Sequence, residues 1–341
     1  MKSSQLPIGV VVPTLNVRTG LPAHLDQLQT WAELVEEIIV VDSYSTDGTV
    51  ELLREKLRHP RLQILQCPPG LYAAWNYGIS HLCAPFAYVS TVGDTITGEG
   101  LQHLAATAEA LHSDVVISRP QFLDADGRPA AEQQWPIHNL LEWGAIKEPA
   151  LVEPWRVFLL ATLDIPEGIL GSSASNLYRT DVLKRLPFPT DYGHAGDTAW
   201  GVLHAFHVSL AVTPKVVSRF VLHPSAARAR SNEKKVLANR LFELARQAAR
   251  EALEQSPPGQ LKELLLPLLS ELPAELQKLR ALQDGYDQLR HQPWPWILNP
   301  SAWRARRERN CQRAQVRQTK EKIRQHFGSS SWAPQWVARE T

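Results

Sequence analysis

The segments VVVPTLN, residues 10–16, and VVDSYSTDGT, residues 40–49, carry the pattern that decides the fold. Each begins with an apolar run typical of a buried strand and ends abruptly in polar residues. Further apolar runs lie at 62–65, 86–90 and 114–118, and amphipathic stretches lie at 21–36, 49–58, 73–82 and 100–112. Strands that alternate with helices predict a mostly parallel α/β sheet with helices on both faces. Ligands of such sheets bind beyond the carboxyl ends of the strands, where both polar segments lie.

The pattern changes further along the chain. Residues 120–190 are rich in Trp and Pro and are expected to be irregular, whereas residues 197–207 return to helical spacing. Residues 209–221 predict a pair of strands. From about residue 231 the spacing is helical almost to the end, with interruptions expected at the prolines 257, 258, 267 and 273. We therefore expect an α/β domain over residues 1–227 and a helical region over residues 228–341.

The charge of the chain supports this division. The 341 residues are 44% hydrophobic and 21% charged, which excludes a mainly disordered protein, and the net charge is only +1. Residues 1–227 hold 15 Lys and Arg against 23 Asp and Glu, whereas residues 228–341 hold 21 against 12. An acidic part with net charge −8 is thus joined to a basic part with net charge +9. Such asymmetry predicts two regions with different partners.

Several classes of protein are excluded by what the sequence lacks. Its three cysteines cannot form a disulfide framework, and no CxxC pair indicates a zinc site. The first apolar run is too short for a signal peptide, and no stretch of 18 apolar residues predicts a spanning helix. We expect a cytoplasmic protein, which fits the reducing environment that free cysteines indicate.

The polar ends of the two opening segments allow two interpretations. Asp42 directly follows a strand and could accept hydrogen bonds from a base or a ribose. The other interpretation is a turn in which Asp47 or Thr49 caps the next helix, and both can hold at once. The backbone at Pro13 and Thr14 could likewise bind a nucleoside or simply turn.

Four motifs in order resemble family 2 glycosyltransferases of the GT-A fold. PTLN and VVDSYSTDGT are followed by GLYAAWNYG at residues 70–78, similar to the G-(I/L)-Y-x-A-x-N-x-G segment of one branch. TVGD, residues 91–94, lies where that family carries its D-x-D-like motif. The resemblance covers about the first 100 residues closely and continues loosely to about residue 225. It implies a nucleotide-sugar donor bound by Pro13, Thr14, Asn16, Asp42, Ser45, Asp47, Tyr72 and Asn76.

The resemblance also implies a divalent cation, Mg²⁺ or Mn²⁺, held by Asp94. Such a cation acts as a Lewis acid on the leaving diphosphate, and a single carboxylate together with substrate oxygens can hold it. From the residues alone, a turn residue of a Gly-flanked loop is the simpler interpretation of Asp94, and the resemblance favours the metal ligand instead. Some relatives place a metal-binding His near His223, although a lone His is usually not a ligand.

An inverting transfer needs a general base for the acceptor hydroxyl. The family places an acidic residue at the start of a helix, and Asp197 in the segment AGDTAW, residues 195–200, matches that position. The alternatives are a plain helix N-cap for Asp197 and a base at His194.

The acceptor is expected to contact Ser172, Ser173 and Trp200. Trp75, Trp143 and Trp155 could also stack on a sugar, although burial in the core is the simpler interpretation for any one tryptophan.

The C-terminal region combines tryptophans with arginines, as in Trp303–Arg309. That composition suits the anionic inner face of a membrane, which would place the protein beside a lipid-linked acceptor. It also suits a solvated helix docked on the first domain or on a second subunit of a homodimer. A nucleic-acid partner is not expected, because the first half is acidic and no nucleic-acid fold is indicated.

The sequence therefore predicts an inverting, metal-assisted glycosyltransferase that uses a glycan or lipid-linked acceptor. A catalytically inactive nucleotide-binding or interaction protein with the same fold is the alternative. It is motivated by departures from the branch: Gln66–Pro69 and Ala73 replace acidic residues, and Gly93 and Gly196 stand where carboxylates are usual. A nucleotidyltransferase is a weaker third possibility, because only Arg18 and Gly20 lie near the first strand to hold a triphosphate.

Overall fold

The computed structural model describes residues 5–163, 165, 167–222, 231–254, 259–290 and 300–327. The chain forms two compact units, Met1–Leu237 and Ala238–Thr341, and each is described by itself. The predicted domain boundary at residues 227 and 228 lies outside the described residues, so it stays a prediction.

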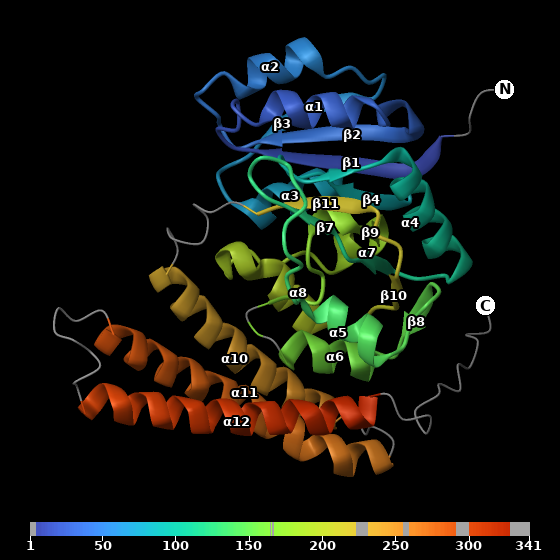
Figure 1. The fold of residues 1–341 in the computed structure, drawn as a ribbon. Coiled ribbons are helices and arrows are strands. Elements are labelled where there is room, and N and C mark those ends of the chain that lie inside the picture. Colours follow the sequence, from blue (N-terminus) through green and yellow to red (C-terminus); the bar gives the residue numbers. More distant parts are fainter. Residues whose placement is uncertain are drawn as a thin grey trace. The chain divides into compact units, whose positions relative to one another are not determined.

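An eight-stranded sheet organises the first unit (Figure 1). Its strand order is β3-β2-β1-β4-β9-β6-β10-β8, in which β1, β2, β3 and β4 run parallel to one another. The strand β9 joins its two neighbours in antiparallel pairs, as does β8 at the edge. The bounds are β1 Leu6–Thr14, β2 Val35–Asp42, β3 Leu62–Gln66, β4 Phe86–Val89, β6 Val115–Ser118, β8 Ala150–Val152, β9 Asn176–Arg179 and β10 Leu210–Thr213. The predicted α/β class with a mostly parallel sheet is confirmed.

Helices cover both faces of this sheet. They are α1 Leu21–Gln29, α2 Thr49–Lys56, α3 Leu71–His81 and α4 Gly98–Ala110, together with α5 Pro136–Trp143, α6 Pro154–Leu163, α7 Thr180–Arg185 and α8 Gly196–His204. Alternate residues of β1 show the two faces: Val10 belongs to the core cluster that includes α1 and α4, whereas Val11 faces α3. A Cβ on Gly78 of α3 would lie only 2.5 Å from Val11 Cγ1, so this helix rests on the sheet only because Gly78 has no side chain.

A second, three-stranded sheet lies beside the first and has the order β5-β11-β7. Its strands are Thr95–Ile96, Ser218–Val221 and Gln121–Leu123 respectively. The two strands expected within residues 209–221 therefore exist, but β10 and β11 belong to different sheets.

Two expectations about secondary structure were wrong. The helix predicted over 21–36 ends at Gln29, because Thr30 caps it and Trp31 turns inward to pack edge-on against Tyr88, at 6.1 Å between ring centroids. Residues 120–190 are not irregular but hold β7, α5, β8, α6, β9 and α7. The helix α6 buries residues on every side, so it lacks the amphipathic period by which a helix is recognised.

The second unit contains α11 Gly259–Arg290 and α12 Pro300–Phe327, while α10 Ser231–Glu254 spans the boundary between the units. The helix α11 is continuous through Pro267 and Pro273, so the predicted breaks are absent there; an interior proline costs a helix one hydrogen bond but does not always end it. The helices α11 and α12 pack together, with the Arg309 guanidinium 4.2 Å from the Tyr286 ring centroid and Arg313 donating to Gln283 at 3.2 Å. No described helix is long and apolar enough to cross a membrane.

One buried carboxylate fixes the start of β4. Glu37 in β2 is 1% exposed and accepts hydrogen bonds from the backbone N–H groups of Cys83 and Ala84, at 2.5 and 2.7 Å. The Arg61 guanidinium lies 3.5 Å from its other oxygen. Glu37 thus ties the loop before β4 to β2.

Replacing this carboxylate should destabilise the fold. We expect Glu37→Ala to lower the free energy of unfolding by about 2–4 kcal/mol, because two buried backbone donors lose their acceptor. Glu36→Ala is the control, since Glu36 is a third exposed and lies 3.9 Å from the same Arg61. Urea unfolding measures both, and equal losses in the two variants would contradict this role.

Candidate active site

The carboxyl ends of β1 and β2 lie side by side and are joined through Asp42. Thr14 pairs with Asp42 in the parallel register, and its hydroxyl donates to Asp42 Oδ1 at 3.1 Å. Ser45 donates to the same carboxylate twice, from its backbone N–H at 2.9 Å and from its hydroxyl at 2.6 Å. Asp42 is fully buried, so its carboxylate shapes the loop that follows β2.

The loops after these two strands are also joined to each other. The Asn16 N–H donates to Ser45 Oγ at 2.8 Å, and Asn16 Oδ1 accepts from the Thr46 N–H at 2.9 Å. Asp47 accepts from the Arg18 N–H at 3.0 Å and from the Thr49 hydroxyl at 2.6 Å, and the Thr49 bond lowers the pKa of the exposed Asp47 carboxyl. The donor-binding residues predicted on these loops are therefore brought together. Their contact with a nucleotide stays a prediction.

Sequence reasoning missed three exposed apolar side chains at the same edge. Leu15 follows β1, Tyr44 follows β2 and Leu71 follows β3, and their exposed fractions are 46%, 54% and 45%. These strands are adjacent in the sheet. Tyr44 also has a positive φ of 58°, which is uncommon for a bulky residue and is often found at functional sites. An aromatic next to Asp42 was visible in the sequence, but its exposure and backbone conformation were not.

Asp94 lies where three segments meet. Its Oδ2 accepts hydrogen bonds from the hydroxyls of Thr91 and Ser172, and its Oδ1 accepts from the Val221 N–H, each at 3.3 Å. Burial raises the pKa of Asp94 to about 7, against the opposing effect of these bonds. Ser173 lies 3.1 Å from Thr91, oxygen to oxygen. Ser172 and Ser173, predicted to contact an acceptor, are thus partners of the Asp94 loop, and that predicted contact is untested.

The residues around Asp94 fit a divalent cation only in part. One carboxylate and hydroxyl oxygens are hard ligands of the kind that Mg²⁺ and Mn²⁺ prefer. Among the described residues, however, no three His, Cys, Asp or Glu side chains gather to hold a metal ion. A cation at Asp94 would need oxygens of the substrate to complete its coordination. His223 lies outside the described residues.

Asp197 is the second residue of α8 and is not its N-cap, a position that Ala195 occupies. Its Oδ1 accepts from the Thr198 N–H at 2.7 Å. Burial raises the pKa of Asp197 to about 6, and a hydrogen bond with the Tyr72 hydroxyl is the largest opposing effect. The alternative prediction that Asp197 is only the N-cap of this helix is therefore wrong. A half-buried carboxyl group whose pKa lies near neutrality has the property that a general base needs.

Tyr72 and Asn76 of α3 contact the segment that precedes α8. Tyr72 is 3% exposed, and its hydroxyl lies 3.3 Å from the His194 carbonyl oxygen, to which it donates. Asn76 Nδ2 donates to the Phe188 carbonyl at 2.8 Å, and Asn76 Oδ1 accepts from the Phe188 N–H at 3.0 Å. Both side chains thus hold this segment in place. Their predicted contact with a nucleotide is untested.

Trp200 is a core residue in the structure, which corrects the expectation that it contacts an acceptor. It is 1% exposed, its indole N–H donates to the Leu186 carbonyl at 2.7 Å, and Phe188 lies 5.5 Å away between ring centroids. Trp75 is also buried, at 4% exposure. An indole with both its ring and its N–H engaged has no face left for a sugar.

The comparisons with known proteins agree with this architecture. The model of the family "Glycosyl transferase family 2" matches residues 9–160, which include most of β1, all of β2, Asp42 and Asp94. This part of the chain is similar to glycosyl transferase family 2. It is 26% identical to glycosyltransferase GlyA of Streptococcus pneumoniae serotype 4 over 171 residues, and 24% identical to glycosyltransferase AglE of Haloferax volcanii over 205 residues. These matches cover 46% and 58% of the chain, but only 25% and 61% of the two relatives.

Solved structures show the fold of this chain. Residues 1–349 of S. aureus TarS superpose with a TM-score of 0.54 at 21% identity, covering 94% of this chain and 91% of that one. The mannosyltransferase PcManGT from Pyrobaculum calidifontis, in complex with GDP-Man and Mn²⁺, superposes with a TM-score of 0.53 at 17% identity, covering 97% and 88%. The predicted GT-A fold followed by C-terminal helices is confirmed.

The raised pKa of Asp197 predicts how its replacement affects stability. Because this pKa lies above the value of about 3.9 in an unfolded chain, the carboxyl group favours folding at low pH, and that contribution is lost as the pH rises through about 6. We expect Asp197→Asn to raise the free energy of unfolding at pH 7.5 by up to about 3 kcal/mol.

Urea unfolding at pH 7.5 and pH 4 measures this effect. The gain should nearly vanish at pH 4, because the wild-type carboxyl group is then neutral in the folded state. The exposed Asp26→Asn serves as the control and should show no gain at either pH. A loss of stability in Asp197→Asn at pH 7.5 would contradict the raised pKa.

Proposed function

We propose that this chain transfers a sugar from a nucleoside-diphosphate sugar to an acceptor hydroxyl with inversion at the anomeric carbon. The observation that carries the proposal is a pair of carboxyl groups, Asp94 and Asp197, whose pKa values burial raises to about 7 and about 6. One follows β4, and the other touches Tyr72 in the first turn of the helix after β3. Desolvated carboxyl groups at the carboxyl edge of a parallel sheet suit an active site.

The donor is proposed to bind across the ends of β1, β2 and β3. TarS has been solved with UDP-GlcNAc and PcManGT with GDP-Man, and both share the fold of this chain. The loops joined by Asn16, Ser45 and Asp47 offer polar groups for a ribose. Tyr44 offers an exposed ring against which a planar base could stack.

In the proposed reaction the acceptor oxygen forms a bond to the anomeric carbon. The bond from that carbon to the diphosphate oxygen breaks, and the nucleoside diphosphate leaves with the electron pair. The acceptor proton passes to the carboxylate of Asp197, which acts as general base. A divalent cation held by Asp94 and the donor phosphates would neutralise the charge of the leaving group.

An inactive binding protein of the same fold is the alternative. It is favoured by the replacement of acidic residues at Gln66–Pro69 and Ala73. Nucleotide binding without turnover would support it. The two raised pKa values favour the enzyme, because carboxyl groups with strongly perturbed pKa values gather at catalytic sites.

Removal of either carboxylate should abolish turnover. We expect Asp94→Asn and Asp197→Asn to reduce hydrolysis or transfer from UDP-GlcNAc or GDP-mannose at least about 100-fold, because each removes charge used in the reaction. Asp26→Asn is the control. Wild-type activity should fall below about pH 6, where Asp197 becomes protonated and can no longer accept a proton. Full activity in either active-site variant would refute the assignment.

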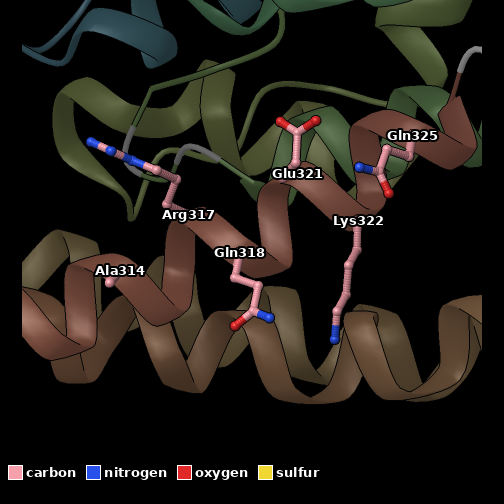
Figure 2. Close-up of a pocket in the computed structure, with 6 residues that line it drawn as sticks. All are labelled: Ala314, Arg317, Gln318, Glu321, Lys322 and Gln325. Carbon is pink, nitrogen blue, oxygen red and sulfur yellow. The ribbon is translucent and has the colours of Figure 1, made fainter.

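The acceptor is proposed to be a glycan or lipid-linked sugar at the inner face of a membrane, reached through α12. Residues 300–327 hold nine Lys and Arg against two Glu, and Trp303 is 55% exposed. One side of α12 packs on α11 through Ala302, Gln312 and Val316. A surface hollow of about 530 Å³ on α12 is lined by Ala314, Arg317, Gln318, Glu321, Lys322 and Gln325 (Figure 2). Exposed basic residues beside an exposed Trp suit an anionic lipid surface.

This contact predicts lipid-dependent binding. The wild-type chain should sediment with vesicles of phosphatidylcholine and phosphatidylserine but not with phosphatidylcholine alone, and high salt should release it. Since each basic residue adds about 1 kcal/mol, the triple variant Arg306→Gln, Arg307→Gln and Arg317→Gln should bind at least about 10-fold more weakly. Arg250→Gln on α10 is the control. Light scattering on the same samples would reveal a homodimer, and a dimer that does not bind vesicles would contradict the membrane contact.

A further inference from the structure

The motif GLYAAWNYG, residues 70–78, places its Tyr72 ring against the backbone that carries Asp197. A Cβ on Gly196 would lie 2.5 Å from Tyr72 Cδ2 and 2.8 Å from Cε2, distances that real Cβ atoms do not reach. The same Cβ would lie 2.5 Å from the Pro189 carbonyl oxygen. The residue before Asp197 must therefore be glycine for Tyr72 to occupy its place. A glutamate there, as is usual in this branch, would displace the ring.

The polar end of Tyr72 reaches the same segment. Its hydroxyl donates to the His194 carbonyl oxygen at 3.3 Å and also interacts with the Asp197 carboxyl group, so its single proton has two competing acceptors. Ring contacts hold the phenol in place, with Trp75 at 4.9 Å and Phe188 at 5.5 Å between ring centroids. A buried ring with packed neighbours has little freedom to move, so the hydroxyl is held at the segment His194–Asp197.

Asn76, one turn further along α3, holds the other end of this segment. Its amide bonds both the N–H and the carbonyl of Phe188, at 3.0 and 2.8 Å. The Phe188 ring then packs against Trp200 of α8, three residues beyond Asp197. Tyr72 and Asn76 thus both bond to the segment that precedes α8. A ligand could reach the amide oxygen or nitrogen of Asn76 only by breaking its bonds to Phe188.

We propose that Tyr72 and Asn76 are positioning residues for Asp197, with the Tyr72 hydroxyl turning from the His194 carbonyl to donate to the ionised Asp197 carboxylate, which takes the proton of the acceptor. This role rests on the proposed function, because it assigns Asp197 as the general base. It differs from the nucleotide contact that the resemblance implies for the same two residues.

The arrangement gives Tyr72 a definite effect on the reaction. A hydrogen bond to the ionised carboxylate favours its charged form, whereas burial disfavours it. The groups that interact with Asp197 are Tyr72 on α3, Tyr178 on β9 and Thr198 on α8 itself. Burial raises the pKa of both tyrosines, so they stay neutral at the pH at which Asp197 titrates. Loss of the Tyr72 hydroxyl should therefore raise the pKa of Asp197.

The test compares Tyr72→Phe with Tyr77→Phe in the full chain. Tyr77 lies on the same helix, is 39% exposed and stacks edge-on with His81, so its variant is the matched control. Hydrolysis of UDP-GlcNAc and GDP-mannose is followed from pH 5 to pH 9, and calorimetry gives the Kd of UDP and GDP. In Tyr72→Phe we expect the acidic limb of the kcat profile to move up by about one pH unit, with nucleotide Kd unchanged within about twofold. Gly196→Ala, which displaces the ring, should move the limb in the same direction.

Three outcomes would overturn the inference. A weaker nucleotide Kd with an unmoved pH profile would assign Tyr72 to the donor instead. An active Tyr72→Phe with the wild-type profile would deny it any role at Asp197. A wild-type chain that binds UDP or GDP but hydrolyses neither donor would refute the proposed function, and the positioning role would fall with it.

Asn76→Ala gives a second measurement of the same role. We expect kcat to fall at least about 10-fold, because the segment before α8 loses both bonds to the Asn76 amide. Circular dichroism checks that the variant is folded. The nucleotide Kd should again be unchanged. A weakened Kd with an unchanged kcat would place Asn76 at the donor.

Discussion

The hydrogen bond between the Thr14 hydroxyl and the Asp42 carboxylate is the interaction on which the rest of the site depends. It lies where two parallel strands end at the same level, and it requires that both strands be buried and in register. Because the carboxylate also accepts twice from Ser45, the loop after β2 turns back and meets the loop after β1 at Asn16. A buried carboxylate is stable only when its oxygens are satisfied, so the loop geometry and the burial of Asp42 require each other.

This constraint explains how much of the molecule could be predicted. The apolar runs Val10–Val12 and Ile38–Val41 are typical of buried strands, and Asp42 and Asp94 follow such runs, so the strands and the position of the loops were accessible from the sequence. The helix α6 was not, because its side chains are buried on all sides and so show no amphipathic period. The strand β8 was not, because three residues are too few to show an alternating pattern. The end of α1 at Gln29 depends on where the Trp31 ring packs, which is a tertiary contact.

The same distinction applies to the residues of the site. Asp94 and Asp197 could be proposed from the resemblance of their segments to family motifs. The partners of Asp94 could not, because Ser172 and Val221 reach it from segments 78 and 127 residues away. Trp200 was placed at an acceptor because a tryptophan can stack on a sugar, yet its indole N–H donates to the Leu186 carbonyl and its ring belongs to the core. Composition gives the kind of contact that a side chain can make, whereas topology decides which contact it makes.

The glycine at position 196, a departure from the family pattern, is explained by its contact with Tyr72. Gly196 in place of an acidic residue removes a charge next to Asp197, which from the sequence alone favours an inactive protein. In the structure it also makes room for the Tyr72 ring, whose hydroxyl donates to the His194 carbonyl beside Asp197 and is proposed to serve the Asp197 carboxylate. A phenol donates a hydrogen bond to a carboxylate and stabilises its ionised form, whereas a neighbouring carboxylate would repel it and raise its pKa further. The loss of an acidic residue at position 196 therefore fits the role proposed for Asp197, because the space that it leaves is filled by Tyr72 of α3.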